Sequence, residues 1–162
     1  MRESIDAKIL SFEDIKRRIL GWRITSDSLV FTNGCFDLLH LGHLEYLIEA
    51  KSLGDRLIIG LNSDASVSKL KGAHRPIHDF NSRATMLACM SFVDAVVIFE
   101  EETPINLIEA IVPDVLVKGG DYEPNQIVGY DVVNKSGGLV KTLSFVEGYS
   151  STNIESRIRG QA

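Results

Sequence analysis

Cysteine, proline and tryptophan are scarce in this chain. Its 162 residues include two cysteines, four prolines and one tryptophan. Cys35 and Cys89 are too few for a disulfide framework and lack the spacing of a metal site, which indicates a reducing compartment. No apolar run approaches the roughly 20 residues that a membrane-spanning helix needs, and the N-terminus does not resemble a secretory signal. We therefore expect a cytoplasmic protein without a membrane partner.

Basic residues are outnumbered by acidic ones. Lys and Arg together number 17 and Asp and Glu 22, which gives a formal net charge of −5. Proteins that bind nucleic acids usually carry a basic surface, so the composition indicates no such partner. A small anionic ligand needs only a local positive site and stays compatible with this charge. The hydrophobic share of 44% is sufficient for a folded core, and the length suggests one main domain.

From residue 28 onward, short apolar runs alternate with helical patterns. The expected strands are residues 29–32, 56–61, 95–99, 115–117 and 139–143. The second run is almost continuously apolar, as is typical of a strand covered on both faces. This alternation predicts a parallel sheet with right-handed crossovers. The expected fold is a Rossmann-like α/β domain, with a five-stranded parallel sheet and helices on both faces.

Two further segments complete the expected organisation. Ser11 begins an amphipathic pattern that places Ile15, Ile19 and Trp22 on one helical face. We expect residues 1–27 to form an N-terminal helical appendage and residues 28–162 to form the main domain. The polar connection at residues 62–80 is long for a compact domain, and such a length often marks a binding loop.

Two histidines at the start of a helix are the most informative feature. In the run Asn-Gly-Cys-Phe-Asp-Leu-Leu-His-Leu-Gly-His at residues 33–43, His40 and His43 are three positions apart with Gly42 between them. Side chains at this spacing share one helical face, and the free N–H groups of a helix start favour an anion. The pattern predicts a phosphate cradle that stabilises charge on phosphorus. The alternative is that one histidine caps the helix and the other is a surface residue.

Polar segments follow the other expected strands. Lys118, Gly120 and Asp121 follow the fourth, where a cation, close backbone approach and a carboxylate suit a phosphate-and-sugar site. Gly148, Ser151 and Thr152 follow the fifth, and hydroxyl groups at a helix start are donors for phosphate. The alternatives are a solvated turn for the first segment and simple N-capping for the second.

The long connection carries basic residues. Lys71 and Arg75 are placed to clamp a triphosphate, with a solvated charge run as the alternative. Arg83 opens the next helix, and we interpret it as structural or interfacial rather than catalytic. His74, His78 and Cys89 form no convincing ligand cluster for a transition metal.

Residues 33–43 resemble the HxGH signature of the cytidylyltransferase-like nucleotidyltransferase family. Ser151 to Ile154 resemble the second signature of that family, two hydroxyl residues followed by a variable residue and isoleucine. Over residues 28–159 the chain is similar to the branch that transfers an adenylyl group from ATP to D-glycero-β-D-manno-heptose 1-phosphate. That reaction yields ADP-heptose and pyrophosphate, for the lipopolysaccharide core. The discriminating segments are residues 75–77, 93–94, 99–104 and 118–122.

The resemblance implies specific roles. His40 and His43 would be catalytic, and Mg²⁺ would arrive with ATP rather than on protein ligands. The implied nucleotide contacts are Thr32, Asn33, Gly34, Cys35, Phe36, Gly42, Lys71, Arg75, Lys118, Gly148, Ser151 and Thr152. The implied substrate contacts are Asp37, Asp64, Gly120 and Asp121.

Partners and alternatives also follow from the resemblance. In many relatives this module is fused behind a sugar kinase. This sequence shows no kinase domain, so we expect a stand-alone enzyme that depends on a separate heptose 7-phosphate kinase. A homodimer is expected, since the helix with Trp22 offers apolar surface. One alternative is a cytidylyltransferase that acts on glycerol 3-phosphate or a related polyol phosphate. The other is a non-catalytic nucleotide-binding regulator, against which the intact His40 and His43 argue.

Overall fold

One parallel sheet organises the molecule. The computed structural model describes residues 1–144 and 146–160, so the last two residues of the expected domain lie outside the described residues. Six strands are paired in parallel in the order β1-β4-β3-β2-β5-β6. They are β1 (Ile9–Leu10), β2 (Leu29–Gly34), β3 (Arg56–Asn62), β4 (Ala95–Phe99), β5 (Val115–Gly119) and β6 (Leu139–Leu143). The predicted Rossmann-like α/β fold is confirmed, with one strand more than the five expected.

The additional strand is β1, at one edge of the sheet. It pairs with β4, with Ile9 opposite Val96 and Leu10 opposite Val97. Two residues leave too short an apolar run to be recognised as a strand in a sequence. The strand therefore exists because a distant segment offers it a pairing partner.

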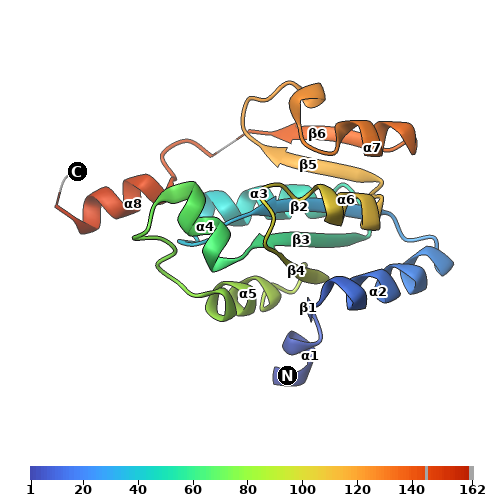
Figure 1. Ribbon diagram of the computed structural model, residues 1–162, viewed down its shortest axis with the longest axis horizontal. Helices are drawn as coiled ribbons and strands as arrows, with labels where there is room; N and C mark the ends of the chain where they lie inside the picture. The colour runs from blue at the N-terminus through green and yellow to red at the C-terminus, as the bar shows by residue number, and fades with distance from the viewer. Residues whose placement is uncertain (145, 161–162) are drawn as a thin grey trace.

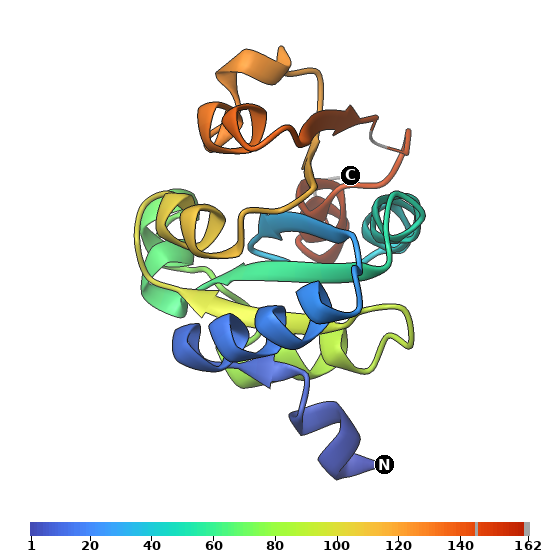
Figure 2. The same ribbon diagram turned by 90° about the vertical axis from the view of Figure 1, so that its right-hand side faces the viewer.

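Helices cover both faces of the sheet, as expected (Figure 2). They are α1 (Arg2–Asp6), α2 (Phe12–Ile24), α3 (Leu41–Lys51), α4 (Asp64–Lys71), α5 (Phe80–Ala88), α6 (Ile105–Ile111), α7 (Tyr130–Lys135) and α8 (Ser151–Ile158). A short 3-10 turn, Pro124–Gln126, precedes α7. Along β2, Val30 packs with α3 and α5, whereas Leu29 and Phe31 pack with α2, α6 and α7. This alternation puts an apolar layer on each side, as a doubly covered parallel sheet requires.

The N-terminal segment belongs to this core. The predicted helix is present as α2, but Ile15, Ile19 and Trp22 are buried against the sheet and β1 extends it. Residues 1–27 are thus packed into the domain rather than appended to it. Trp22 is only 8% exposed, with the Arg56 guanidinium over its ring. It does not offer the apolar surface on which we based the expected dimer.

The polar connection at residues 62–80, which we expected as a binding loop, contains a helix. Its first half forms α4, which Ser63 caps by accepting a hydrogen bond from the Ser66 N–H at 3.1 Å. Val67 is the only fully apolar side chain that this helix buries among its described residues. One buried apolar position in two turns gives no helical periodicity, which is why the sequence did not predict this helix.

The carboxyl ends of the strands meet at one edge of the molecule. In Figure 1 the strand arrows point to the left, and α4 and α8 lie at that end. The segments that follow β2, β5 and β6 gather there, where ligands bind in open parallel sheets. Of the helices described, none has the length and apolar composition to cross a membrane.

Candidate active site

A cavity of about 620 Å³ opens at the carboxyl edge of the sheet. Both predicted catalytic residues, His40 and His43, line it. The predicted nucleotide contacts that also line it are Asn33, Gly34, Cys35, Phe36, Gly42, Lys71, Lys118, Gly148, Ser151 and Thr152. Segments far apart in the chain therefore supply one pocket of a size suited to a nucleotide.

The two histidines stack on each other at the start of α3. His40 is the N-cap residue, and its carbonyl accepts a hydrogen bond from the His43 N–H at 2.9 Å. The ring centroids are 3.9 Å apart with an interplanar angle of 24°. The Phe36 ring lies against His43, at 5.4 Å between centroids. The helix start thus directs both imidazoles into the same small volume.

Both imidazoles are held in the neutral form. Burial, together with the neighbouring His40 and Lys71, lowers the pKa of His43 to about 4. Burial also lowers the pKa of His40. The two Nδ1 atoms are buried and find no hydrogen-bond partner within the part of the chain that the structure describes. A bound phosphate would offer these rings an acceptor and would favour their protonated forms.

We expect this depressed pKa to be directly measurable. In the protein without nucleotide, the His43 ring should stay neutral from pH 8 down to about pH 5, because its pKa is about 4. Adding tripolyphosphate should raise the pKa, since a nearby anion stabilises imidazolium. Ring-nitrogen chemical shifts in an NMR titration report both states. A His43 pKa near 6.5 in the free protein would contradict the burial seen here.

Gly42 is required by the close packing around the histidines. A Cβ atom at this position would lie 3.1 Å from His40 Nδ1 and 3.1 Å from Tyr149 Cβ. Tyr149 comes from the segment before α8, next to Gly148, which has a φ of +84°. The glycine therefore lets the α8 segment approach the histidine pair.

A second cavity of about 350 Å³ adjoins the first. Asn33, Gly34, Cys35, Lys118 and Tyr122 line both. The Lys118 Nζ lies 3.4 Å from Asn33 Oδ1, and burial lowers its pKa. No ion pair joins Lys118 to a carboxylate among the described residues. A half-buried ammonium group between two cavities favours an anion at the boundary.

The start of α8 also contributes to the wall of the cavity. Ser150 is the N-cap, and its Oγ accepts a hydrogen bond from the Asn153 N–H at 3.0 Å. Ser151 Oγ donates to the Leu38 carbonyl at 3.3 Å. N-capping therefore occupies Ser150, whereas Ser151 and Thr152 line the cavity.

Some predicted contacts lie outside the cavity. Among the described residues, its lining does not include Thr32, Asp64, Arg75, Gly120 or Asp121. The Thr32 hydroxyl and the Tyr46 hydroxyl share a buried hydrogen bond of 2.6 Å, which leaves no free group for a ligand. The Gly120 N–H donates to the Leu143 carbonyl. Thr32 and Gly120 thus have partners within the protein, and each such partner competes with a ligand.

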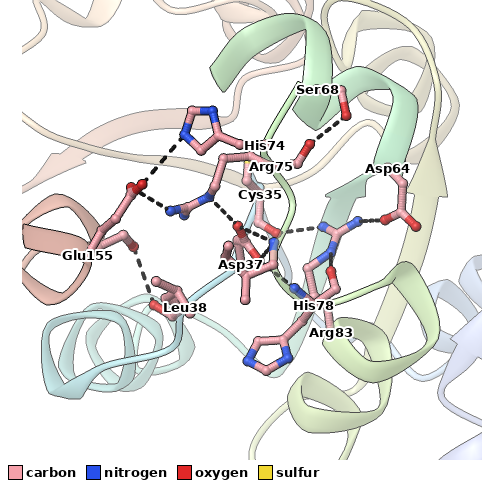
Figure 3. Close-up of polar contacts among 12 residues, drawn as sticks. Cys35, Asp37, Leu38, Asp64, Ser68, His74, Arg75, His78, Arg83 and Glu155 are labelled. Carbon is pink, nitrogen blue, oxygen red and sulfur yellow. Dashed lines mark hydrogen bonds and ion pairs between the residues drawn. The ribbon is translucent and has the colours of Figure 1, made fainter. Parts of the chain in front are cut away.

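Arg75 departs most clearly from its prediction as a phosphate clamp. Its guanidinium is 4% exposed and pairs with Asp37 at 2.5 Å and with Glu155 at 3.1 Å (Figure 3). Asp37 also accepts hydrogen bonds from the N–H groups of Ile77 and His78, at 2.8 and 2.9 Å. Burial raises the pKa of Asp37, but these two N–H groups and Arg75 outweigh it, so the pKa lies below its usual value. Both side chains are thus engaged within the protein.

Arg83 has the structural role that the sequence indicates. Its fully buried guanidinium donates to the carbonyls of Cys35 (2.6 Å), Asn62 (2.8 Å) and His78 (3.0 Å). It also pairs with Asp64 at 2.6 Å, so Asp64 is a structural partner rather than a free substrate ligand (Figure 3). One side chain thereby joins three segments at the carboxyl edge.

Sequence reasoning missed several residues of the site. Tyr46, Tyr122 and Tyr149 line the cavity, and Glu155 holds Arg75. Burial raises the pKa of Tyr46 to about 12, which keeps its hydroxyl protonated. Tyr122 and Tyr149 stand next to two of the sequence motifs, and this position could have indicated that they line the site. The sequence gives no such indication for Glu155, because 80 positions separate it from its partner Arg75.

Curated relatives match almost the whole chain. It is 52% identical over 154 residues to the bifunctional protein HldE of Geotalea uraniireducens, covering 95% of this chain and 31% of that protein. It is 53% identical over 153 residues to the bifunctional protein HldE of Geobacter metallireducens, covering 94% and 31% respectively. The chain therefore spans about a third of the length of the curated relatives it matches.

One solved structure and a family sequence model support the same relationship, and a second structure shares the fold. A lipopolysaccharide core biosynthesis protein from Thermoplasma volcanium has a TM-score of 0.60 and 28% identity, covering 76% of this chain and 99% of that one. A pantoate-β-alanine ligase from Francisella tularensis has a TM-score of 0.60 at 14% identity, covering 93% and 76%, and shares the fold alone. The cytidylyltransferase-like family model matches residues 31–157. With its stacked histidines at the start of α3, this chain belongs to the cytidylyltransferase-like family of nucleotidyltransferases.

Proposed function

We propose that this protein transfers the adenylyl group of ATP to D-glycero-β-D-manno-heptose 1-phosphate, with release of pyrophosphate and formation of ADP-heptose. The stacked His40 and His43, which share one cavity with Ser151 and Thr152, carry the proposal for adenylyl transfer. The choice of sugar is supported by the resemblance of residues 118–122 and by about 50% identity to HldE proteins.

The arrangement suits direct in-line transfer. A phosphate oxygen of the acceptor attacks the α-phosphorus of ATP, a new P–O bond forms, and the bond to the leaving pyrophosphate breaks. The imidazoles of His40 and His43 donate hydrogen bonds to the α-phosphate as its charge shifts, a stabilisation by fixed donors. Catalysis then depends on positioning and charge stabilisation rather than on a covalent intermediate.

Cys35 is a poor candidate for a covalent step. Burial raises the pKa of its thiol, which keeps it protonated at neutral pH. A thiol attacks phosphorus or carbon as the thiolate, so a raised pKa suppresses that reactivity. We assign Cys35 to the wall that the two cavities share.

The second cavity suits the acceptor sugar. Glu102, Thr103 and Gln126 line it, and their side chains are suited to hydrogen bonds with sugar hydroxyl groups. Lys118 stands at the boundary with the nucleotide cavity, where the acceptor phosphate would meet the α-phosphate. An ammonium group there would offset the repulsion between the two anions.

We assign Mg²⁺ to the triphosphate as part of the substrate. Among the residues that the structure describes, no group of three or more His, Cys, Asp or Glu side chains is placed to hold a metal ion. Lys71, Ser151 and Thr152 line the cavity and are the residues we propose for the β- and γ-phosphates. Arg75 is withdrawn from this role because Asp37 and Glu155 already hold it.

Substrate preference is the decisive test of this function. We expect kcat/KM for ATP with the heptose 1-phosphate to exceed that for CTP with glycerol 3-phosphate. Pyrophosphate release, measured with each nucleotide across a panel of sugar and polyol phosphates, compares the two. Faster turnover of CTP with glycerol 3-phosphate would assign the protein to the alternative cytidylyltransferase activity. A protein that binds ATP without any turnover would be the nucleotide-binding regulator instead.

Two partner predictions remain proposals. A heptose 7-phosphate kinase is proposed to act upstream, whether on the same polypeptide or on another one. The homodimer also stays a prediction, and it now rests on exposed side chains of α2 other than Trp22. Leu20 and Ile24 are 67% and 84% exposed.

A further inference from the structure

Helix α8 reaches the active site without a fully buried apolar side chain. Its first residues, Ser151 and Thr152, line the nucleotide cavity, yet none of its residues, all of which are described, is fully buried. A helix of eight residues is not stable by itself in water. Specific contacts must therefore hold its first turn beside the histidines.

Ser151 and Glu155 make the polar contacts that join α8 to distant parts of the chain. Ser151 Oγ donates to the Leu38 carbonyl at 3.3 Å. One turn further along, the Glu155 carboxylate accepts a hydrogen bond from Arg75 at 3.1 Å and lies 3.5 Å from His74 Nε2 (Figure 3). Glu155 is 25% exposed and Arg75 is 4% exposed, so this pair is shielded from solvent far better than His74, which is 55% exposed. Shielded pairs are weakened less by salt and water.

Arg75 links α8 to the segment that carries the histidines. Its guanidinium lies between Glu155 and Asp37, and Asp37 precedes His40 in the segment between β2 and α3. The N–H groups of Ile77 and His78 fix Asp37 from the other side. The row Asp37–Arg75–Glu155 therefore joins the two walls of the nucleotide cavity.

We infer that Glu155 is a positioning residue, which holds the first turn of α8 at the cavity through Arg75. The inference rests on the proposed function for its ligand, ATP. Glu155 does not line the cavity itself, so its effect on the nucleotide is exerted through Ser151 and Thr152. When Glu155 is removed, the buried pair of Arg75 with Asp37 remains, so the domain should keep its fold.

The test compares Glu155→Ala and Glu155→Gln with the wild type. Calorimetric titration with a non-hydrolysable ATP analogue and Mg²⁺ should show a Kd raised roughly ten- to a hundredfold for Glu155→Ala, the scale of losing one charge-assisted hydrogen bond to the ligand. Glu155→Gln should be affected less, since its amide oxygen still accepts a hydrogen bond from Arg75. Backbone hydrogen exchange should become faster in residues 151–158 and stay unchanged in the sheet. The KM for the sugar phosphate should change little.

Arg159→Ala is the matched control. Arg159 pairs with the same carboxylate at 2.5 Å but is 53% exposed, so its loss removes a surface contact and leaves Arg75 in place. This variant should bind the analogue as the wild type does. Unchanged affinity in Glu155→Ala overturns the inference, whether or not α8 exchanges faster. A wild-type protein that fails to bind ATP refutes the proposed function instead, and the exchange of α8 then still decides whether Glu155 holds the helix.

Discussion

Replacing His43 by alanine is expected to lower kcat by on the order of a hundredfold or more, the typical cost of losing one preorganised donor. The His43 ring lies 3.9 Å from that of His40 and is held in place by Phe36, so it needs no rearrangement to meet the developing charge. The affinity for ATP should be nearly retained, because Lys71, Ser151 and Thr152 still line the cavity. Steady-state kinetics and a separate binding titration distinguish the two effects.

The neutral state of the imidazoles in the free protein explains why kcat should fall while the affinity for ATP is nearly retained. With its pKa at about 4 in the free protein, His43 would have to take up a proton at neutral pH before it attracts the ground-state triphosphate as a cation, and the cost of that uptake offsets the attraction. Its N–H dipole acts when negative charge accumulates on the α-phosphate oxygens. His78→Ala is the control, because the His78 side chain is exposed and its contacts to Asp37 and Arg83 come from the backbone. A normal kcat with a raised KM in His43→Ala would show that the residue only binds.

Replacing Arg83 by methionine is expected to give the largest loss of stability. The variant leaves the carbonyls of Cys35, Asn62 and His78 without their donor in the interior of the carboxyl edge. A single unsatisfied buried group costs about 1–3 kcal/mol, so we expect the free energy of unfolding to fall by about 3 kcal/mol or more. For a domain of this size, each kcal/mol shifts the Tm by about 2–4 °C, so the Tm should fall by roughly 6–12 °C.

Thermal unfolding followed by circular dichroism measures this change. Arg17→Met is the matched control, because Arg17 is 75% exposed and pairs only with Asp14 of its own helix in the described part of the chain. Loss of such a surface pair should change the Tm by very little. If Arg83→Met has the same Tm as the wild type, water must replace the guanidinium at all three carbonyls. Arg83 would then not be the residue that joins these segments.

The sequence alone was sufficient where neighbouring residues decide the outcome. The three-residue spacing of His40 and His43 predicts a shared helical face, and the structure stacks the two rings. The helix start expected within residues 33–43 is present, because α3 begins at Leu41. The five predicted strands are present: β2 to β5 are mostly buried, whereas β6 at the sheet edge buries only Leu143. These outcomes depend on periodicity and helix-start chemistry within about ten residues.

Tertiary structure decided which polar groups are free to meet a ligand. Lys71 and Arg75 look alike as cations of one segment, yet Lys71 lines the cavity and Arg75 is enclosed by Asp37 and Glu155. Asp64 likewise pairs with Arg83. A charged side chain takes the best partner that the fold brings within reach, and burial makes an internal ion pair of good geometry costly to break. That partner comes from another part of the chain, so no local sequence pattern reveals it. The same holds for the two-residue strand β1, which exists only through its pairing with β4.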